Sequence, residues 1–286
     1  MNKQGNTYTF LYSVVLVVVV AALLSIVSLS LQPRQNENRQ NEKRQNILSA
    51  IHISSTAANS AELFDKYIKE QFIINSKGDR IEGKAFDVNI EKQYNLPVEK
   101  RELPVFVANV DGATKYILPI YGAGLWGPIW GYISLDDNKD TVYGTFFDHQ
   151  GETPGLGAEI TTPEFNKKFR NKQIFSGNQL VGILVVKGGN ASGANEVDAI
   201  SGGTITSKGV ETMIKNYFAH RAQLKEERAL AREAALARKR EEIAKTEEPE
   251  DLQEKEEDID TEEKEKLDIE TVPPVEDELF PRHEFD

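Results

Sequence analysis

The first feature of the chain is an abrupt change from apolar to polar residues near its N-terminus. Residues 10–31 form an apolar run of 22 residues, and no charge lies between Lys3 and Arg34. A helix of that length extends about 33 Å, which is enough to cross the hydrocarbon core of a bilayer. A cleaved signal peptide is the alternative, but its apolar region usually has only ~7–15 residues and ends at a small-residue cleavage site, which is not evident here. We expect a transmembrane anchor over residues 1–32 and a polar stalk over residues 33–46.

The middle of the chain carries both helical and strand-like patterns. Residues 61–71 have apolar side chains at helical spacing, preceded by a candidate N-cap at Asn59 or Ser60. Short runs rich in Val, Ile, Tyr and Phe follow, and Gly, Asp and Asn turns separate them, as is typical of strands. These runs cover residues 85–89, 104–110, 115–122, 130–136, 141–148 and 180–187. The pattern predicts an α+β domain over residues 47–220, built on a mostly antiparallel sheet.

Toward the C-terminus the apolar periodicity gives way to dense charge. A helix with an apolar stripe is expected to begin near Ser207. Residues 221–246 are mainly Ala, Arg and Glu, which favours a solvated helix, and residues 247–286 have the charge density of a disordered acidic tail. A weak seven-residue repeat also allows a coiled-coil seam. Its members are Ala222, Ala229, Leu236 and Ile243.

The net charge of −12 belongs almost entirely to that tail. From Glu247 onward, 19 acidic residues face 4 basic ones, a net of −15, so the preceding 246 residues carry +3. Because no basic face is apparent, we expect no nucleic-acid partner. The absence of cysteine excludes disulfides, iron–sulfur ligation and thiolate chemistry. The four histidines are scattered without the spacing of metal ligands, so no metal site is expected.

Two glycine-rich stretches between the expected strands are candidates for a binding site. Residues 121–132 hold four glycines with Trp126 and Trp130, so a planar cofactor could stack there. A β-hairpin with buried tryptophans is the alternative, and it is favoured on this stretch alone. Residues 149–160, "HQGETPGLGAEI", form a shaped loop. It could be a cofactor wall, an acid/base pair of His149 and Glu152, or a purely structural loop.

The third candidate is the stretch "VDAISGGTITSKGV", residues 197–210. Gly202 and Gly203 leave the backbone open, and the dipole of the helix that follows favours an anion at the same place. Hydroxyl side chains flank the two glycines: Ser201, Thr204, Thr206 and Ser207. The P-loop pattern GxxxxGK[ST] and the dinucleotide pattern GxGxxG are both absent. From these residues alone, the stretch could be a plain turn, a phosphate cradle or an attachment site.

Together with the anchor, the three stretches resemble the C subunit of the Na⁺-translocating NADH:quinone oxidoreductase, up to about residue 220. The flavin-attachment pattern of that family is Asp, two variable residues, Ser or Thr, Gly, Ala and the acceptor Thr. Here the pattern runs from Asp198 to Thr204, with Gly203 in place of the usual alanine. The resemblance implies one FMN per chain, joined through its phosphate to the Thr204 hydroxyl as a phosphoester.

The resemblance also implies roles for the residues around the attachment point. Ser201, Gly202 and Gly203 would line it, and Asp198 would shape it for a flavin transferase that moves FMN from FAD. Thr206 would donate to the phosphate or, like Ser207, cap the helix. The matching loops give the expected flavin neighbours: Leu125, Trp126, Glu152, Thr153, Leu156 and Gly157. The flavin would carry electrons one at a time between other subunits of the complex, while the protein tunes its potential.

Membrane orientation is the point at which the residues and the resemblance disagree. Only Lys3 precedes the anchor, whereas four basic residues follow it, so the positive-inside rule places the domain in the cytoplasm. These four are Arg34, Arg39, Lys43 and Arg44. The family has this domain outside the cell inner membrane, in the periplasm. We follow the resemblance, because Asn, Gln and Glu dilute the stalk and partner subunits can set the topology.

Two alternative functions stay open from the sequence. The G subunit of Rnf-type electron-transport complexes also carries threonine-linked FMN, although the pair Leu125–Trp126 favours the first family. A cofactor-free, membrane-anchored scaffold protein would instead use the solvated helix and the acidic tail as its working parts. One transmembrane helix without intramembrane charge forms no ion path by itself, so ion pumping would belong to the assembly.

Overall fold

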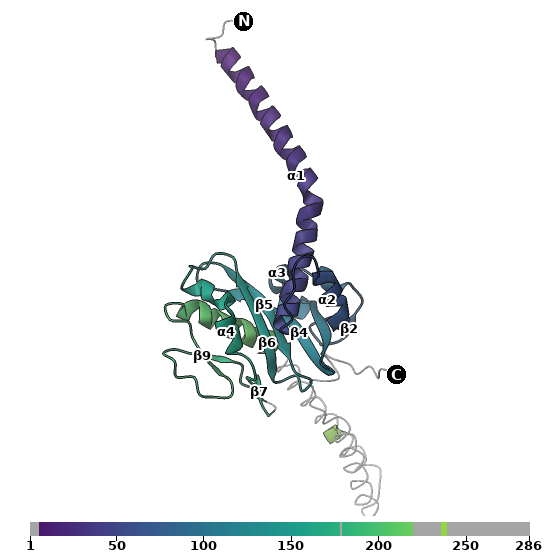
Figure 1. The fold of residues 1–286 in the computed structure, drawn as a ribbon, viewed down its shortest axis with the longest axis vertical. Helices are drawn as coiled ribbons and strands as arrows, with labels where there is room; N and C mark the ends of the chain where they lie inside the picture. Colours follow the sequence, from purple (N-terminus) through teal and green to yellow (C-terminus); the bar gives the residue numbers. More distant parts are fainter. Residues whose placement is uncertain (1–5, 178, 220–235, 239–286) are drawn as a thin grey trace, which may run out of the picture.

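The structure, a computed structural model, describes residues 6–177, 179–219 and 236–238 (Figure 1). A long N-terminal helix leads into a domain made of a sheet and shorter helices. The predicted solvated helix at residues 221–246, with its seven-residue repeat, lies outside the described residues except for residues 236–238, which are helical. The predicted acidic tail at residues 247–286 also lies outside them.

The elements of the domain follow one another with short connections. The helices are α1 (Asn6–Ala50), α2 (Ser60–Tyr67), α3 (Ile90–Tyr94), α4 (Pro163–Lys167) and a final helix over residues 204–219, with 3₁₀ turns η1 (Ala85–Asp87), η2 (Val98–Lys100) and η3 (Gly157–Thr161). The strands are β1 (Ile68–Ile74), β2 (Arg80–Ile81), β3 (Leu103–Val110), β4 (Ala113–Ala123), β5 (Pro128–Leu135), β6 (Val142–His149), β7 (Phe175–Ser176), β8 (Gln179–Leu180), β9 (Leu184–Val186) and β10 (Glu196–Asp198).

Six of these strands form one sheet in the order β2-β1-β3-β4-β5-β6, and every neighbouring pair is antiparallel. The strands β7 and β8 form a small antiparallel pair, and β9 and β10 form a parallel pair. The predicted α+β class with a mostly antiparallel sheet is therefore confirmed.

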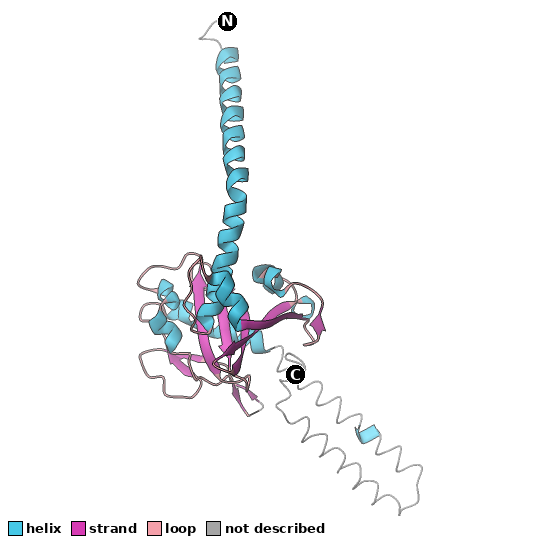
Figure 2. Cartoon of the chain, turned by 45° about the vertical axis from the view of Figure 1, so that its right-hand side comes forward, coloured by secondary structure: helices cyan, strands magenta, loops and turns pink. Residues whose placement is uncertain are grey.

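Helices cover both faces of the large sheet. Successive residues of a strand point to opposite faces, so one strand contributes side chains to both core clusters. On β4, Leu118 belongs to one core cluster and its neighbour Ile117 to the other. The first cluster includes residues of the final helix and of the segment around α4, while the second includes the end of α1 and residues of α2. Figure 2 shows α1 running down onto the sheet.

The helix α1 joins the expected anchor to the domain without a break. It has 45 residues, roughly 67 Å at the rise of an α-helix, and it contains Pro33. Within the described residues, only this helix is long and apolar enough to cross a membrane. The predicted polar stalk is thus helical. Because Lys43 and Arg44 already lie against Phe86, contacts with the domain begin before residue 47.

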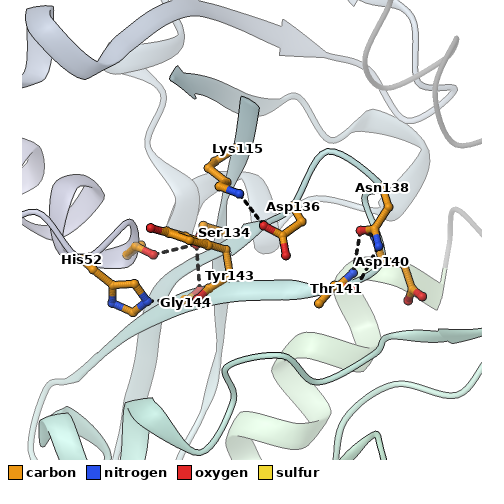
Figure 3. Close-up of polar contacts among 10 residues, drawn as sticks. His52, Lys115, Ser134, Asp136, Asn138, Asp140, Thr141, Tyr143 and Gly144 are labelled. Carbon is orange, nitrogen blue, oxygen red and sulfur yellow. Dashed lines mark hydrogen bonds and ion pairs between the residues drawn. The ribbon is translucent and has the colours of Figure 1, made fainter. Parts of the chain in front are cut away.

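The C-terminal end of α1 is fixed to the sheet by buried contacts. Leu48 and Ile51 are fully buried in the core. Ser134 Oγ donates to the carbonyl of Ala50 at 2.6 Å, and the ring Nε2 of His52 donates to the carbonyl of Tyr143 at 3.0 Å (Figure 3). These contacts tie the orientation of the long helix to that of the sheet.

Two local predictions were wrong. The helix predicted at residues 61–71 ends at Tyr67, and Ile68–Ile74 form the strand β1. The apolar residues after Tyr67 fit helical spacing, but Phe72 and Ile74 pack in one cluster and Ile73 in the other, which requires an extended backbone. Residues 85–89, predicted as a strand, contain the 3₁₀ turn η1, which buries Ala85 in the cluster that holds the end of α1.

Candidate functional site

The turn before the final helix is the centre of the site. The strand β10 ends at Asp198, Gly203 N donates to the carbonyl of Ile200 at 3.0 Å, and the helix starts at residue 204. Gly202 has a φ of +75°, a backbone conformation that glycine adopts without strain. The turn therefore presents its hydroxyls at the first turn of a helix.

The loop after β6 lies directly on this turn, which explains both glycines. A Cβ atom at Gly202 would stand 2.5 Å from Leu156 Cδ2, and one at Gly203 would stand 2.8 Å from the Leu156 carbonyl oxygen. Neither position has room for a side chain while Leu156 stays where it is. At Gly203 the atom in the way is a backbone oxygen, so even the methyl group of an alanine would require the loop to move.

The four hydroxyls of the turn are not equivalent. Thr206 Oγ1 is buried and donates to Glu152 Oε2 at 2.6 Å. Ser207 Oγ is buried as well, accepts from Ile200 N at 3.1 Å and donates to the carbonyl of Gly203 at 2.8 Å. Ser201 is exposed and Thr204 is half-buried, and neither side chain makes a hydrogen bond within the described part of the chain. Of the four hydroxyls, these two are available to a ligand.

The glycine-rich stretch at residues 121–132 forms the hairpin of β4 and β5, in which Tyr121 pairs with Trp130. At its tip, Leu125 is 49% exposed and Trp126 is 70% exposed. The alternative of a hairpin with buried tryptophans is therefore wrong for Trp126. Large exposed apolar side chains at a tip are unusual unless something covers them.

Glu152 connects the hairpin tip to the final helix. Its buried carboxylate accepts from Trp126 N at 2.9 Å through Oε1 and from Thr206 through Oε2. Burial opposes its ionisation, but the Thr206 hydroxyl, the amides of Trp126 and Leu125 and the nearby His149 outweigh burial and hold the pKa of Glu152 below its ordinary value. Glu152 is thus an ionised, internally bonded carboxylate.

Of the three alternatives for this loop, the acid/base pair of His149 and Glu152 does not form. His149 Nδ1 accepts from the backbone N of Glu152 at 3.1 Å, whereas the carboxylate turns toward Trp126 and Thr206. The loop is a framework for neighbouring elements, because both carboxylate oxygens of Glu152 are used inside the protein.

The remaining predicted residues lie around the same turn. Thr153 is exposed, and its carbonyl accepts from the amides of Leu156 and Ala158. The carboxylate of Asp198 binds the preceding loop, because its Oδ1 accepts from Ala191 N at 3.0 Å. The backbone carbonyl of Asp198 accepts from Lys168 Nζ at 3.2 Å. Among the described residues, no cluster of side chains could hold a metal ion.

The sequence did not single out Ile205. It lies beside Thr204 and is 61% exposed, and Leu156 is 42% exposed. Together with Leu125 and Trp126, these side chains make what we name the apolar rim of the turn. An isoleucine between two threonines outside the apolar stripe of the helix was the signal that could have indicated it.

Trp130 is separated from the apolar rim. It lines a cavity of about 440 Å³ on the face of the hairpin that carries Tyr121 and Tyr132, together with Lys43 of α1. Lys43 Nζ donates to the carbonyls of Phe86 and Val88. Burial lowers the pKa of Lys43 to about 8, against the opposing attraction of Asp87. The two tryptophans therefore do not form a joint stacking site.

Comparison with known proteins agrees with this geometry. Residues 124–219 match the FMN-binding domain family. The chain is 30% identical over 234 residues to the C subunit of the Na(+)-translocating NADH-quinone reductase of Haemophilus ducreyi, covering 76% of this chain and 91% of that protein. It is also similar to the crystal structure of the C subunit of the same reductase from Parabacteroides distasonis, with a TM-score of 0.64 and 45% identity over 68% of this chain and 96% of that one. The Shewanella oneidensis NqrC structure has a TM-score of 0.57 and 26% identity, over 66% of this chain and 98% of that one.

All 12 predicted site residues fall inside the segment that matches the FMN-binding domain family. The apolar rim, Glu152 and the turn that carries Thr204 therefore lie in one domain of known type. The similarity extends over nearly the full length of the relatives, so partial matching of a common module does not account for it. The chain belongs to the family of the C subunit of the Na(+)-translocating NADH-quinone reductase, and it contains an FMN-binding domain.

Proposed function

We propose that this chain is a membrane-anchored flavoprotein subunit that carries one FMN, bound through a phosphoester to Thr204, and passes electrons one at a time. Family membership and the FMN-binding domain support the flavin. The covalent link rests on the attachment pattern from Asp198 to Thr204 and on the state of the hydroxyls in the turn.

The observation that carries the proposal is the difference in burial and hydrogen bonding among those hydroxyls. Thr206 and Ser207 are buried and already hydrogen-bonded, whereas Thr204 is half-buried at the start of the helix and its side chain makes no hydrogen bond within the described residues. Attachment at Thr204 would leave the internal bonds intact. The helix dipole at the same place favours the negative charge of a phosphate.

The residues present fit a flavin. The isoalloxazine ring of FMN is joined to the phosphate by a ribityl chain, so it needs an apolar wall within reach of that chain. The exposed side chains of the apolar rim, Leu125, Trp126, Leu156 and Ile205, would supply it. Thr153 and Gly157 belong to the loop that positions Leu156, and Ser201 lies exposed beside the attachment point. When bound, FMN would supply the one-electron chemistry, and the chain would hold it and set its surroundings.

Attachment by a flavin transferase would form the bond between Thr204 Oγ1 and the FMN phosphorus of FAD. The pyrophosphate bond would break, AMP would leave, and the hydroxyl proton would pass to a base of the transferase or to water. Asp198 acts on this site indirectly, because its carboxylate holds the loop at Ala191 next to the turn. Thr206 has committed its only proton to Glu152, so it does not donate to a phosphate while that bond lasts.

We further propose that α1 is the single membrane anchor in the inner membrane, that the domain is periplasmic, and that the partners are the other subunits of the complex, the transferase and the lipid. The continuous helix from the apolar run into the core supports a fixed attachment of domain to membrane. Protease added to intact spheroplasts should cut the domain. Protection from external protease would place it in the cytoplasm.

The test of the covalent link is the intact mass of the chain made together with the transferase. We expect one added FMN, a fluorescent band on a denaturing gel, and loss of both in Thr204→Ala. Thr212→Ala is the matched control, because Thr212 is an exposed threonine of the same helix outside the attachment pattern, so its loss should keep the flavin. A wild-type chain with the mass of its amino acids alone would refute the proposal, as would a flavin that survives in Thr204→Ala.

A further inference from the structure

Glu152 is a buried carboxylate that joins three separate parts of the domain. The residue lies in the loop after β6 and is 4% exposed. Its Oε1 accepts from Trp126 N of the hairpin tip at 2.9 Å, and its Oε2 accepts from Thr206 Oγ1 of the final helix at 2.6 Å. We name this set of contacts the Glu152 clamp. Within the described residues of the site, Glu152 is the side chain whose hydrogen bonds reach both the hairpin tip and the helix start.

Two glycines make the space in which the carboxylate sits. A Cβ atom at Gly124 would stand 2.4 Å from Glu152 Oε1. A Cβ atom at Gly157 would stand 2.3 Å from Glu152 Oε2 and 2.5 Å from Thr206 Oγ1. Both sides of the carboxylate are thus in close contact with backbone that carries no side chain, so a small sideways movement of Glu152 is blocked.

The clamp is held mainly by hydrogen-bond dipoles, and the attraction of His149 is the smallest of the contributions that favour the ionised carboxylate. The ion pairs of Arg80, Lys115 and Lys208 in the described part of the chain involve other carboxylates. Hydrogen bonds from amides and a hydroxyl to an ionised carboxylate are stronger than those between neutral groups, and they fix direction as well as distance. A clamp of this kind holds the donors in place.

We infer that Glu152 is a positioning residue: it sets the apolar rim at a fixed place relative to Thr204, so that the flavin ring meets its wall as soon as it is attached. The inference rests on the proposed function for the role of the flavin, but the clamp itself is tested without it. Glu152 acts through Leu125, Trp126 and Thr206 and does not touch the phosphate.

The first experiment uses amide hydrogen exchange on the full chain in detergent without flavin. In Glu152→Gln, the amide oxygen can still accept from Trp126 N and the amide NH₂ can donate to Thr206 Oγ1, but both bonds lose the negative charge. We expect the Trp126 amide to exchange roughly threefold to tenfold faster, as for the change from a charge-assisted to a neutral hydrogen bond. Thr206→Val should have a similar effect, and Thr206→Ser, which keeps the hydroxyl, should restore protection.

Glu159→Gln is the matched control. Glu159 lies in the same loop and its Oε1 accepts from Gly155 N at 3.0 Å, so its contact stays within the loop. The same charge is removed without cutting a link between elements, and exchange at Trp126 should stay at the wild-type rate. Equal exchange at Trp126 in wild type and in Glu152→Gln would overturn the inference, as would equal acceleration by Glu159→Gln.

The second experiment uses the chain loaded with flavin. Glu152→Gln retains Thr204, so it should still gain the mass of one FMN, but the visible circular dichroism and the midpoint potential of the flavin should shift from wild type, whereas Glu159→Gln should leave both in place. An unshifted flavin in Glu152→Gln would show that the clamp is merely structural and would overturn the positioning role. If the wild-type chain takes up no flavin, the proposed function fails and the positioning role with it. The exchange result then still says whether the clamp exists, so the two failures are distinguishable.

Discussion

The final helix lies so close to β4 that Gly209 has no room for a side chain, and this contact yields a prediction with a definite sign. A Cβ atom at Gly209 would stand 2.4 Å from the carbonyl oxygen of Ala123 and 3.3 Å from Ile129 Cδ1. Ordinary contact begins at 3.4 Å, so Gly209→Ala requires the helix or the strand to move by about 1 Å. The atom in the way is a backbone oxygen, which cannot rotate aside as a side chain would.

Two effects of Gly209→Ala oppose each other. Replacing glycine by alanine inside a helix stabilises it by about 0.8–1 kcal/mol through backbone entropy. Forcing an extra methyl group into a packed contact costs typically about 1–3 kcal/mol. Because the clash is severe and with backbone, we expect the steric cost to exceed the propensity gain, and the free energy of unfolding to fall by about 1–2 kcal/mol.

Denaturant unfolding of the full chain in detergent, followed by circular dichroism, measures this change. Gly151→Ala is the control, because nothing lies within 4 Å of a Cβ atom there and the backbone is not left-handed, so it should be neutral or slightly stabilising. The reasoning is refuted if Gly209→Ala is as stable as wild type or more stable. That result would mean that helix propensity outweighs the contact with Ala123.

Three further perturbations test the anchoring of α1. Ser134→Ala leaves the buried carbonyl of Ala50 without its donor and should lower the unfolding free energy by about 1–3 kcal/mol in denaturant titrations; an unchanged midpoint would count against the contact. Leu48→Ala truncates a fully buried side chain and should cost about 2–5 kcal/mol, whereas no loss would mean that this end of α1 is outside the core. Because burial, opposed by Asp87, lowers the pKa of Lys43 to about 8, the unfolded chain keeps this proton up to 10.5 and the folded chain does not, so Lys43 should make stability rise with pH from about 8. The rise should end near pH 10, where Tyr94 and Tyr132, whose pKa values burial raises from 10.0, give the opposite slope. NMR titration of Lys43 checks the value, Lys43→Met should remove the rise, and a titration near 10.5 would contradict it.

Several parts of the fold followed from the sequence because local chemistry specifies them. The apolar run at residues 10–31 needs no context to form a helix in lipid, since backbone groups there must pair within the segment. The strands β3 to β6 were indicated by short runs rich in Val, Ile, Tyr and Phe and by the Gly, Asp and Asn turns between them. The boundary at Tyr67 was missed because the same apolar residues fit helix and strand spacing, and only packing on both faces of the sheet selects the strand.

In the site, too, some features followed from the sequence and others only from the folded structure. The sequence located Thr204, Glu152 and Trp126 through a glycine-rich pattern and a resemblance, but the residues are far apart along the chain and their contacts were not readable. It left three roles open for the loop of Glu152, namely a cofactor wall, an acid/base pair with His149 or a structural loop, whereas the folded chain turns the carboxylate to Trp126 and Thr206. A carboxylate bonds to whichever donors the fold brings within reach, and sequence spacing does not give that.

The sequence by itself determined the anchor, the α+β class, the tail charge and the position of the attachment pattern, because composition, periodicity and a linear motif are properties of neighbouring residues. Only the tertiary structure decided which two hydroxyls of the turn are committed to internal hydrogen bonds, how exposed Trp126 is, and how the end of α1 joins the sheet. These features depend on burial and on two long-range hydrogen bonds: Thr206 donates to Glu152 across 54 positions, and Ser134 donates to Ala50 across 84 positions. Both bonds exist only after the chain has folded around both faces of the sheet.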